Sequence, residues 1–410
     1  MHPALQGLIT IVLGVGGCLG YFYLANLALD KYIFPPRLDD AGRNINRANL
    51  TRPWLFLLPA LIALGVYLAY PVIETLRLSL TDRQLDGAFV GFANYQQMFG
   101  EPKFWEAMRN NMLWLIVVPA ASTAFGLLAA QLTDRIGWGN IAKSLIFMPM
   151  AISFVGASVI FKLIYDARPM GQAQIGVLNV VWLQFDGGIG SLLFLRLLPV
   201  IILFAFAGIV AYAVWIVLRP IFSGSSAAGI LVKLVQVLLS GLGLYLIGLA
   251  LFNIVSVFGA DYTYGVPQNW LTLPFWNSFF LMVVLIWIQT GFAMVILSAA
   301  LRGIPEETIE AAIVDGANPF QLFFRIKVPQ IMGTIVVVWT TITLTVLKVF
   351  DIVYAMSNGQ WQTQVLANYM FDKLFRANDW GVGSASAIIL MLMVMPILVW
   401  NVANARKEMR

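Results

Sequence analysis

The chain has 410 residues, of which 60% are hydrophobic and only 11% are charged, against about 45–50% and about 25% in soluble domains. This composition excludes an ordinary soluble domain and is typical of a protein that crosses a membrane repeatedly. The single cysteine, Cys18, excludes an internal disulfide, the single histidine, His2, argues against a histidine-based metal or catalytic centre, and the net charge of +5 comes from loop cations rather than from a nucleic-acid footprint.

Nine stretches are apolar enough and long enough to cross a bilayer, which takes about 20 residues in a helix. We therefore predict an all-α polytopic membrane protein with about nine transmembrane helices. The predicted spans lie near 5–29, 54–78, 111–132, 142–164, 190–218, 229–258, 275–300, 331–355 and 383–403.

The lysines and arginines predict the orientation in the membrane, because cytoplasmic loops collect positive charge. They gather between the first two spans and at the C-terminus, as Lys31, Arg37, Arg43, Arg47, Arg52, Arg406, Lys407 and Arg410. Nine alternating spans then place the N-terminus outside, and the C-terminus and the polar segment 302–330 in the cytoplasm. The cations in or beside the 79–110 loop oppose this topology, and they are Arg77, Arg83, Lys103 and Arg109.

The first segment, 1–30, is predicted to be an additional transmembrane helix. It is not expected to be a cleaved secretory signal, because it lacks a basic N-terminal region and is too long. The polar residues 31–53, which include Pro35 and Pro36, predict a cytoplasmic linker between this helix and the rest of the chain.

Two of the predicted spans lie within 185–260 and are joined by small residues at 223–229. Their strong charges, Arg196, Arg219 and Lys233, lie near span ends, where they can reach the membrane interface. The pair either packs on lipid or contacts a partner, and nothing in it carries chemistry.

The charged segment 302–330 lies between two apolar spans and predicts a helical hairpin. Glu306 and Glu307 favour the positive end of a first helix, and Gly316 supplies a stop. Asn318 can then cap a second helix, with Gln321 completing a capping box, and Pro329 is expected to end it. Three phenylalanines, Phe320, Phe323 and Phe324, form an apolar knob. The alternative is an ordinary amphipathic loop lying on the membrane surface.

The hairpin contains the stretch Glu310-Ala311-Ala312-Ile313-Val314-Asp315-Gly316-Ala317. A second stretch, Ile326-Lys327-Val328-Pro329, follows with nine residues between Gly316 and Ile326. Together the two stretches resemble the EAA loop of ABC-importer permeases. Val328 stands where that family usually has leucine. The resemblance implies a six-helix core, with helices 1–3 within 54–165, helices 4–6 within 275–405, and 185–260 as a two-helix insert. It also implies that 302–330 is a cytoplasmic coupling loop seated on an ATPase through Glu310, Ala311, Ala312, Asp315, Gly316, Ala317, Phe323, Ile326 and Pro329.

Two further regions resemble the sugar-importer branch of that family. One comprises 71–82 with 89–95, and the other comprises 348–359 with 381–387. The second region is similar to permeases for α-glucosides and other di- or oligosaccharides. The small residues of 381–387 are also explained by close helix packing alone.

The 331–355 span carries polar side chains along one face, and polar groups in a membrane are costly unless they face protein or water. The stripe is therefore a candidate sugar path, although threonines also bond to their own helix and join neighbouring helices. Lys348 and Asp351, three residues apart, are expected on one helix face, where they either pair or contact the substrate or outer gate. The candidate path residues are Gln289, Thr341, Thr345, Lys348, Phe350, Asp351 and Tyr354.

No Gly-x-x-x-x-Gly-Lys-Ser/Thr loop occurs in the chain, so it is not predicted to be an ATPase or to have any catalytic or metal site. The resemblance implies that ATP and Mg are bound by two cytoplasmic ATPase subunits. It also implies a second homologous permease and a periplasmic or lipid-anchored solute-binding protein, contacted through Asn358, Gly359, Gln360 and Trp361.

The sequence thus predicts a permease subunit of an ATP-driven sugar importer in the bacterial inner membrane, working by alternating access. An importer for a polyol or a glucosylglycerol-type osmolyte is an alternative. A secondary transporter is less favoured, because the sequence lacks the carboxylates within the membrane spans that ion coupling would need. A membrane enzyme is less favoured, because no cluster of acidic residues or histidines occurs.

Overall fold

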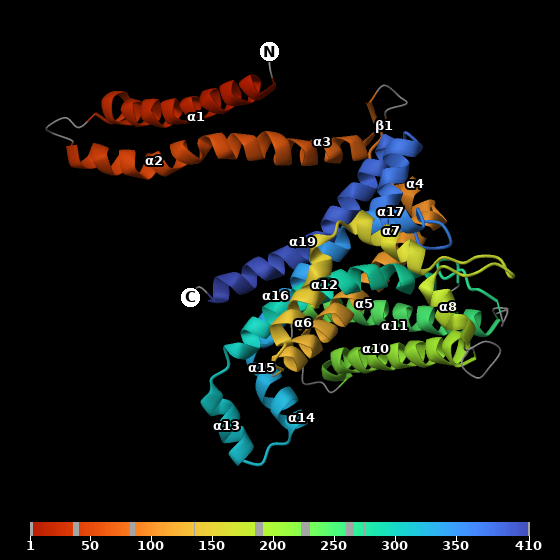
Figure 1. Ribbon diagram of the computed structural model, residues 1–410. Coiled ribbons are helices and arrows are strands. Elements are labelled where there is room, and N and C mark those ends of the chain that lie inside the picture. Colours follow the sequence, from red (N-terminus) through yellow and green to blue (C-terminus); the bar gives the residue numbers. More distant parts are fainter. Residues whose placement is uncertain are drawn as a thin grey trace. The chain divides into compact units, whose positions relative to one another are not determined.

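The structure is a computed structural model that describes residues 3–35, 41–82, 87–134, 136–184, 192–222, 230–259, 266–273 and 276–408 (Figure 1). These residues are mostly helical, as predicted. The described strands are β1 (Thr81–Asp82) and β2 (Ala88–Phe89), which pair antiparallel with Thr81 opposite Phe89. The chain divides into two compact units, Met1–Gly91 and Phe92–Arg410.

The first unit is a hairpin of two long apolar helices. Helix α1 (Pro3–Ala28) continues into a π-helical turn, η1 (Leu29–Ile33), and the return segment consists of α2 (Ala41–Leu64), η2 (Gly65–Ala69) and α3 (Tyr70–Ser79). The Tyr21 hydroxyl donates to the Leu55 carbonyl at 2.6 Å, and Arg52 pairs with Asp30 at 2.9 Å. The predicted linker is therefore helical from Ala41 onward, and the unit contains the first predicted core span together with the additional helix.

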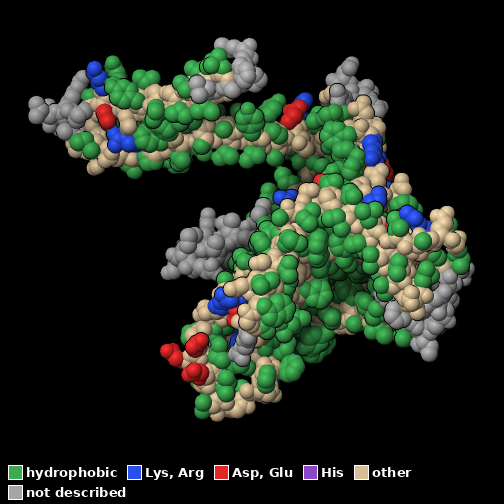
Figure 2. All heavy atoms as spheres, viewed as in Figure 1, with side chains coloured by type: hydrophobic (Ala, Val, Ile, Leu, Met, Phe, Trp, Pro, Cys, Tyr) green, Lys and Arg blue, Asp and Glu red, His purple; other side chains and the backbone are tan. Residues whose placement is uncertain are grey.

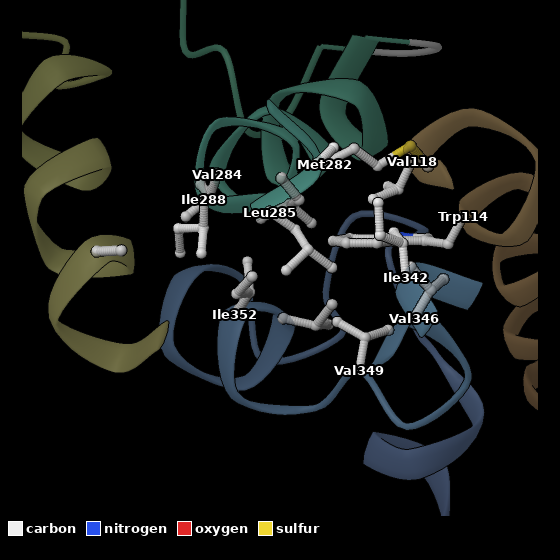
Figure 3. Close-up of a cluster of buried hydrophobic side chains, with 14 of the residues drawn as sticks. Trp114, Val118, Met282, Val284, Leu285, Ile288, Ile342, Val346, Val349 and Ile352 are labelled. Carbon is white, nitrogen blue, oxygen red and sulfur yellow. The ribbon is translucent and has the colours of Figure 1, made fainter. Parts of the chain in front are cut away.

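The second unit is built around three helices, α5 (Pro102–Thr133), α12 (Trp276–Arg302) and α16 (Met332–Leu347). Figure 3 shows side chains from all three directed at one another, among them Trp114 of α5, Leu285 of α12 and Ile342 of α16, all buried. Lipid tails are as apolar as these side chains, so close packing rather than removal of apolar area from water holds such helices together in a bilayer.

Helices α5 and α12 approach closely because of a glycine. A Cβ atom on Gly126 of α5 would lie 2.5 Å from Ala293 Cβ and 2.9 Å from Met294 N, both on α12. The backbones are thus in near contact at this point, in the way small residues permit between transmembrane helices.

Apart from the segments 193–259 and 306–330, the remaining elements of this unit are short helices around the core and one long C-terminal helix (Figure 1). They are α4 (Ala93–Gly100), α6 (Gly139–Phe147), η3 (Met148–Ala151), α7 (Phe154–Ile164), α8 (Val177–Gln184), α17 (Asp351–Met356), α18 (Leu366–Phe371), η6 (Asp372–Arg376) and α19 (Trp380–Glu408).

The described residues contain six helices long and apolar enough to span a membrane, or up to eight if each of two bent pairs is one span. The predicted 142–164 span is one such pair, bent by 105° between Gly139–Ala151 and Phe154–Ile164. Ser153 lies at this bend and caps α7, since its side chain accepts from the Gly156 N–H. The predicted 331–355 span is also not one helix, because α16 ends at Leu347 and α17 begins at Asp351.

The predicted insert is a helical hairpin of its own. It comprises η4 (Leu193–Leu197), α10 (Leu198–Phe222) and α11 (Ile230–Gly259), and α10 packs along α11 (Figure 1). Asn179 joins the segments that precede and follow the insert. Its side chain donates to the carbonyls of Asp166 and Gln268 at 2.8 and 3.0 Å and accepts the Gln268 N–H at 2.9 Å. The insert therefore leaves the core and returns to it at one place.

We expect Gly126→Leu to destabilise the protein by about 1–3 kcal/mol, the usual cost of overpacking, because the new side chain forces α5 and α12 apart. Gly248→Leu is the matched control, since a Cβ there meets no atom within 4 Å. Apparent thermal unfolding of the two purified variants measures the difference. Equal unfolding temperatures would contradict the close approach.

Candidate coupling hairpin and transport path

The segment after α12 forms two helical pieces with a sharp turn between them. Helix α13 (Glu306–Val314) ends at Asp315, and Gly316 has a φ of +82°, a conformation that costs other residues strain. The second piece consists of α14 (Pro319–Gln321), η5 (Leu322–Lys327) and α15 (Val328–Gln330). The predicted capping box is present: Asn318 Oδ1 accepts the Gln321 N–H at 2.8 Å, and Gln321 Oε1 accepts the Asn318 N–H at 3.0 Å.

Two details of this hairpin, residues 303–330, differ from the prediction. The second piece is π-helical in its middle, and it runs through Pro329 to Gln330 instead of ending at the proline. Proline is tolerated there because it lies in the first turn of α15. The chain then bends by 71° into α16.

The hairpin extends away from the helices of the second unit and presents an exposed surface (Figure 1). Acidic side chains gather on it (Figure 2), and Val314, Phe320 and Phe324 are 86%, 76% and 62% exposed. Of the predicted coupling residues, Ala312 is buried and Ala317, Phe323 and Ile326 are half-buried. The exposed ones are Glu310, Ala311, Asp315, Gly316 and Pro329. Such a mixture of charge and exposed aromatic surface is suited to a protein partner.

Polar contacts join the end of α5 to the last residue of α12, from which the hairpin starts, and to the hairpin itself near its other end. Asp134 accepts from Arg302 Nε at 2.7 Å and from Lys143 Nζ at 3.2 Å, and Lys143 also donates to Ser298 Oγ at 2.6 Å. Near the other end, the buried Lys327 donates to Gln131 Oε1 at 3.3 Å.

Burial raises the pKa of the Asp134 carboxyl, but the hydrogen bonds from Arg302 and Lys143 outweigh it, and the pKa lies below its ordinary value. None of these cluster residues was among the predicted site residues. The sequence contains a partial indication of the contact, since Asp134 and Arg302 each follow the C-terminal end of a predicted span, 111–132 and 275–300.

The predicted polar stripe lies on an exposed face of α16. Thr341 and Lys348 are exposed and Thr345 is half-buried. The two threonines donate to carbonyls of their own helix, Thr341 to Val337 at 2.8 Å and Thr345 to Thr341 at 3.2 Å. Their oxygens can still accept hydrogen bonds, so back-bonding does not remove them as candidate path residues. Gln289 of α12 is instead buried, at 9% exposure, and does not share this exposed surface.

The expected placement of Lys348 and Asp351 on one helix face is wrong, because the helix is interrupted between them. Lys348 follows the last residue of α16, and Asp351 is the first residue of α17. Among the ion pairs of the described residues none joins them. Each charge is favoured where it lies by its own helix dipole, the cation at a C-terminal end and the anion at an N-terminal end.

The predicted path aromatics belong to a larger cluster. The rings of Phe350 and Tyr354 are stacked with centroids 5.1 Å apart, and Phe371 lies 5.2 and 5.3 Å from them. Phe375 extends the cluster, and the Arg376 guanidinium lies over the Tyr354 ring at 5.5 Å. The i,i+4 spacing of Phe371 and Phe375 in the sequence is consistent with their contact on one helix face.

The loop after α17 contains the residues predicted to contact a binding protein. Asn358, Gly359 and Trp361 all have positive φ, of 52°, 69° and 53°. Gln360 and Trp361 are exposed, whereas Gly359 is buried. Gln364 and Asn368 lie so close to Gly359 that a Cβ there would overlap them. Gly359 therefore shapes the loop, and Gln360 and Trp361 provide its surface.

In the part of the chain that the structure describes, no three His, Cys, Asp or Glu side chains gather where they could hold a metal ion.

Long apolar helices with a projecting polar hairpin are a combination typical of membrane transport proteins. Residues 193–408 match the family described as the binding-protein-dependent transport system inner membrane component. The chain belongs to this family of importer permeases.

Two curated relatives are similar over most of the chain. One, 50% identical over 100% of this chain and 99% of its own length, is the alpha-glucoside transport system permease protein AglF of Rhizobium meliloti. Another, 36% identical over 86% of this chain and 99% of its own length, is the osmoprotective compounds uptake permease protein GgtC of Synechocystis. The fold is similar to that of a solved bacterial ABC transporter that imports alginate, with a TM-score of 0.58 at 18% identity, covering 89% of this chain and 98% of that one.

The lowered pKa of Asp134 predicts how this cluster responds to pH. A pKa below the ordinary value of 3.8 means that the charged carboxylate contributes stability above that pH, and that the contribution is lost as the pH falls through the lowered value. We expect Asp134→Asn to lower the apparent unfolding temperature at pH 7 by about 1–3 °C, as a partly exposed ion-pair cluster would.

The difference from the unaltered protein should shrink below about pH 4. Thermal unfolding between about pH 2.5 and pH 8 in lipid measures it. Asp30→Asn, from the more exposed Arg52 pair, is the control. A difference that grows on acidification would contradict the assignment.

Proposed function

We propose that this chain is the permease subunit of an importer for α-glucosides or related di- and oligosaccharides. The observation that carries the substrate class is the 50% identity to a permease named for alpha-glucoside transport, which extends over the whole of both chains. A second candidate substrate is an osmolyte of the glucosylglycerol type or a polyol, because a relative named for osmoprotective compounds is 36% identical.

The hairpin is the proposed docking element for the ATPases. It offers Glu310 and Asp315 as charges, a turn fixed by Gly316, and the exposed rings of Phe320 and Phe324. On this proposal two cytoplasmic ATPase subunits bind ATP and Mg, and the hairpin carries their closure into the membrane helices. The hairpin then lies in the cytoplasm, and with the nine predicted spans this corresponds to an external N-terminus and a cytoplasmic C-terminus.

The exposed polar face of α16 is the proposed lining of the sugar path. A polar stripe facing lipid would be costly, so Thr341, Thr345 and Lys348 are best explained by a path shared with a second permease. Hydroxyl and amine groups replace the water around sugar hydroxyls, and the stacked rings of Phe350 and Tyr354 can cover the apolar face of a pyranose. Alternating access follows when the two ATPase states favour different orientations of this path.

The exposed loop around Trp361 is the proposed contact for an external solute-binding protein. A solved alginate transporter, similar in fold to this chain, was determined in complex with a periplasmic protein carrying an alginate pentasaccharide. Residues other than glycine with positive φ are costly and persist where the surrounding structure fixes them, often at functional sites. Asn358 and Trp361 fit this description.

Two substitutions on the hairpin, one that reverses a charge and one that strains the turn, should uncouple transport. We expect Glu310→Lys and Gly316→Asp to leave the protein in the membrane, to lower uptake by about tenfold, equivalent to roughly 1.4 kcal/mol, and to loosen ATPase attachment. Glu306→Lys, on the first turn of the same helix, is the matched control because it lies outside the predicted contact set. Normal uptake and normal co-purification of the ATPases in both variants would overturn the docking proposal.

The substrate is tested by ATP hydrolysis of the complete complex in lipid, stimulated by its binding protein. We expect stimulation with one or more of maltose, trehalose and sucrose, because these contain α-glucosyl groups. Stimulation by glucosylglycerol alone would favour the second candidate. Stimulation only by an amino-acid control, or uptake that persists without the ATPases, would overturn the sugar-importer proposal.

A further inference from the structure

Helix α5 contacts both the proposed ATPase-docking hairpin and the proposed binding-protein loop. At its end nearest the hairpin, Gln131 accepts from Lys327, and Asp134, one residue past the helix, holds Arg302. Lys327 and Arg302 lie near the two ends of the hairpin, so one helical turn contacts both of its connections to the membrane helices.

The opposite end of α5 fixes the loop that follows α17. Asn110 Nδ2 donates to the carbonyls of Gln362 and Gln364, each at 2.8 Å. Asn111 Oδ1 accepts the Leu366 N–H at 2.8 Å, and Glu106 Oε1 accepts the Gln364 N–H at 3.2 Å. Asn110 and Asn111 are buried, so these contacts are shielded from solvent.

These contacts hold a strained backbone. Trp361 and Gln362 have φ values of +53° and +62°, which few residues other than glycine adopt. The Asn277 side chain of α12 donates to the Trp361 carbonyl, so the helix that precedes the hairpin also contacts this loop. The conformation that exposes Trp361 therefore depends on α5 and α12 together.

Between its two ends α5 is continuous and closely packed. Asn110 and Asp134 are separated by about 36 Å along the helix axis, at about 1.5 Å per residue. Pro119 removes one backbone hydrogen bond, but the helix continues through it. The near contact of Gly126 with Ala293 joins α5 to α12, so a tilt of one helix must carry the other.

We propose that α5 transmits the position of the hairpin to the Trp361 loop, with Asp134 and Asn110 as the positioning residues at its two ends. This inference rests on the proposed function, since it requires that the hairpin docks an ATPase and the loop meets a binding protein. Neither positioning residue touches the sugar or ATP; each fixes the orientation of a segment that touches a partner.

The test is a double-mutant cycle in the complete complex in lipid, with Asp134→Asn and Asn110→Ala made singly and together. We expect each single variant to lower the maximal stimulation of ATP hydrolysis by liganded binding protein about fivefold or more, the lower range of coupling between distant sites. The ATPases should still co-purify. The double variant should be no worse than the more severe single variant, because both changes interrupt the same route.

Two further measurements separate positioning from general damage. In Asp134→Asn the binding-protein concentration that gives half-maximal stimulation should stay unchanged while the maximum falls, and Asp134→Glu, which keeps the charge, should restore the maximum. Asn179→Ala is the matched control for Asn110→Ala, since Asn179 is also buried and also donates to two carbonyls. It should leave the stimulation near normal.

Multiplicative losses in the double variant, or an equal loss in Asn179→Ala, would overturn the inference. So would dissociation of the ATPases from the Asp134→Asn complex, because Asp134 would then support docking itself. Failure of the underlying function is distinguishable: if Glu310→Lys leaves ATPase attachment and stimulation unchanged, the hairpin proposal fails. Normal stimulation in Asp134→Asn beside a defective Glu310→Lys overturns only the role of α5.

Discussion

The close contact between α5 and α12 at Gly126 is the interaction on which the second unit depends. It brings two long backbones together in an environment where lipid competes with every apolar side chain, so fit rather than hydrophobicity selects the partner. Both helices then place polar residues at their ends, outside the apolar region. Asp134 and Arg302 meet near one end, and Asn277 of α12 and Asn110 of α5 contact the same loop near the other.

Local structure was predictable from the sequence where one or two residues decide the backbone. The capping box of Asn318 with Gln321 and the turn at Gly316 are such cases, because the interacting groups are within a few residues of each other. The contact of Asp134 with Arg302 joins residues 168 positions apart, and that of Asn110 with Gln362 joins residues 252 apart. Hydrophobic periodicity and capping residues are local patterns that do not indicate contacts between residues so far apart in sequence. The sequence therefore predicted the hairpin but not the side chains that hold it to α5.

The hydropathy of the sequence also predicted one continuous helix for each of the spans 142–164 and 331–355, whereas each is broken in the structure. Hydropathy measures composition, and an apolar run remains apolar whether it is one helix or two. At Lys348 to Phe350 the chain leaves the helical conformation, with Phe350 at φ −138° and ψ −57°, and a new helix starts at Asp351. The break explains why the candidate path residues separate into a threonine and lysine stripe along α16 and its C-terminal end and an aromatic cluster at α17. A pairing of Lys348 with Asp351 fails for the same reason.

The exposed stripe of α16 also bears on what the chain can do alone. Thr341 and Thr345 satisfy their own hydroxyl protons within the helix, which lowers the cost of placing them in a membrane. Lys348 differs, since among the described residues its amine makes no hydrogen bond or ion pair with the protein. Its exposed amine requires water, a sugar hydroxyl or a protein acceptor beside it. A water-filled path between this chain and a second permease meets that requirement, whereas a lipid-facing surface does not, and this supports the proposed pairing over a chain that acts alone.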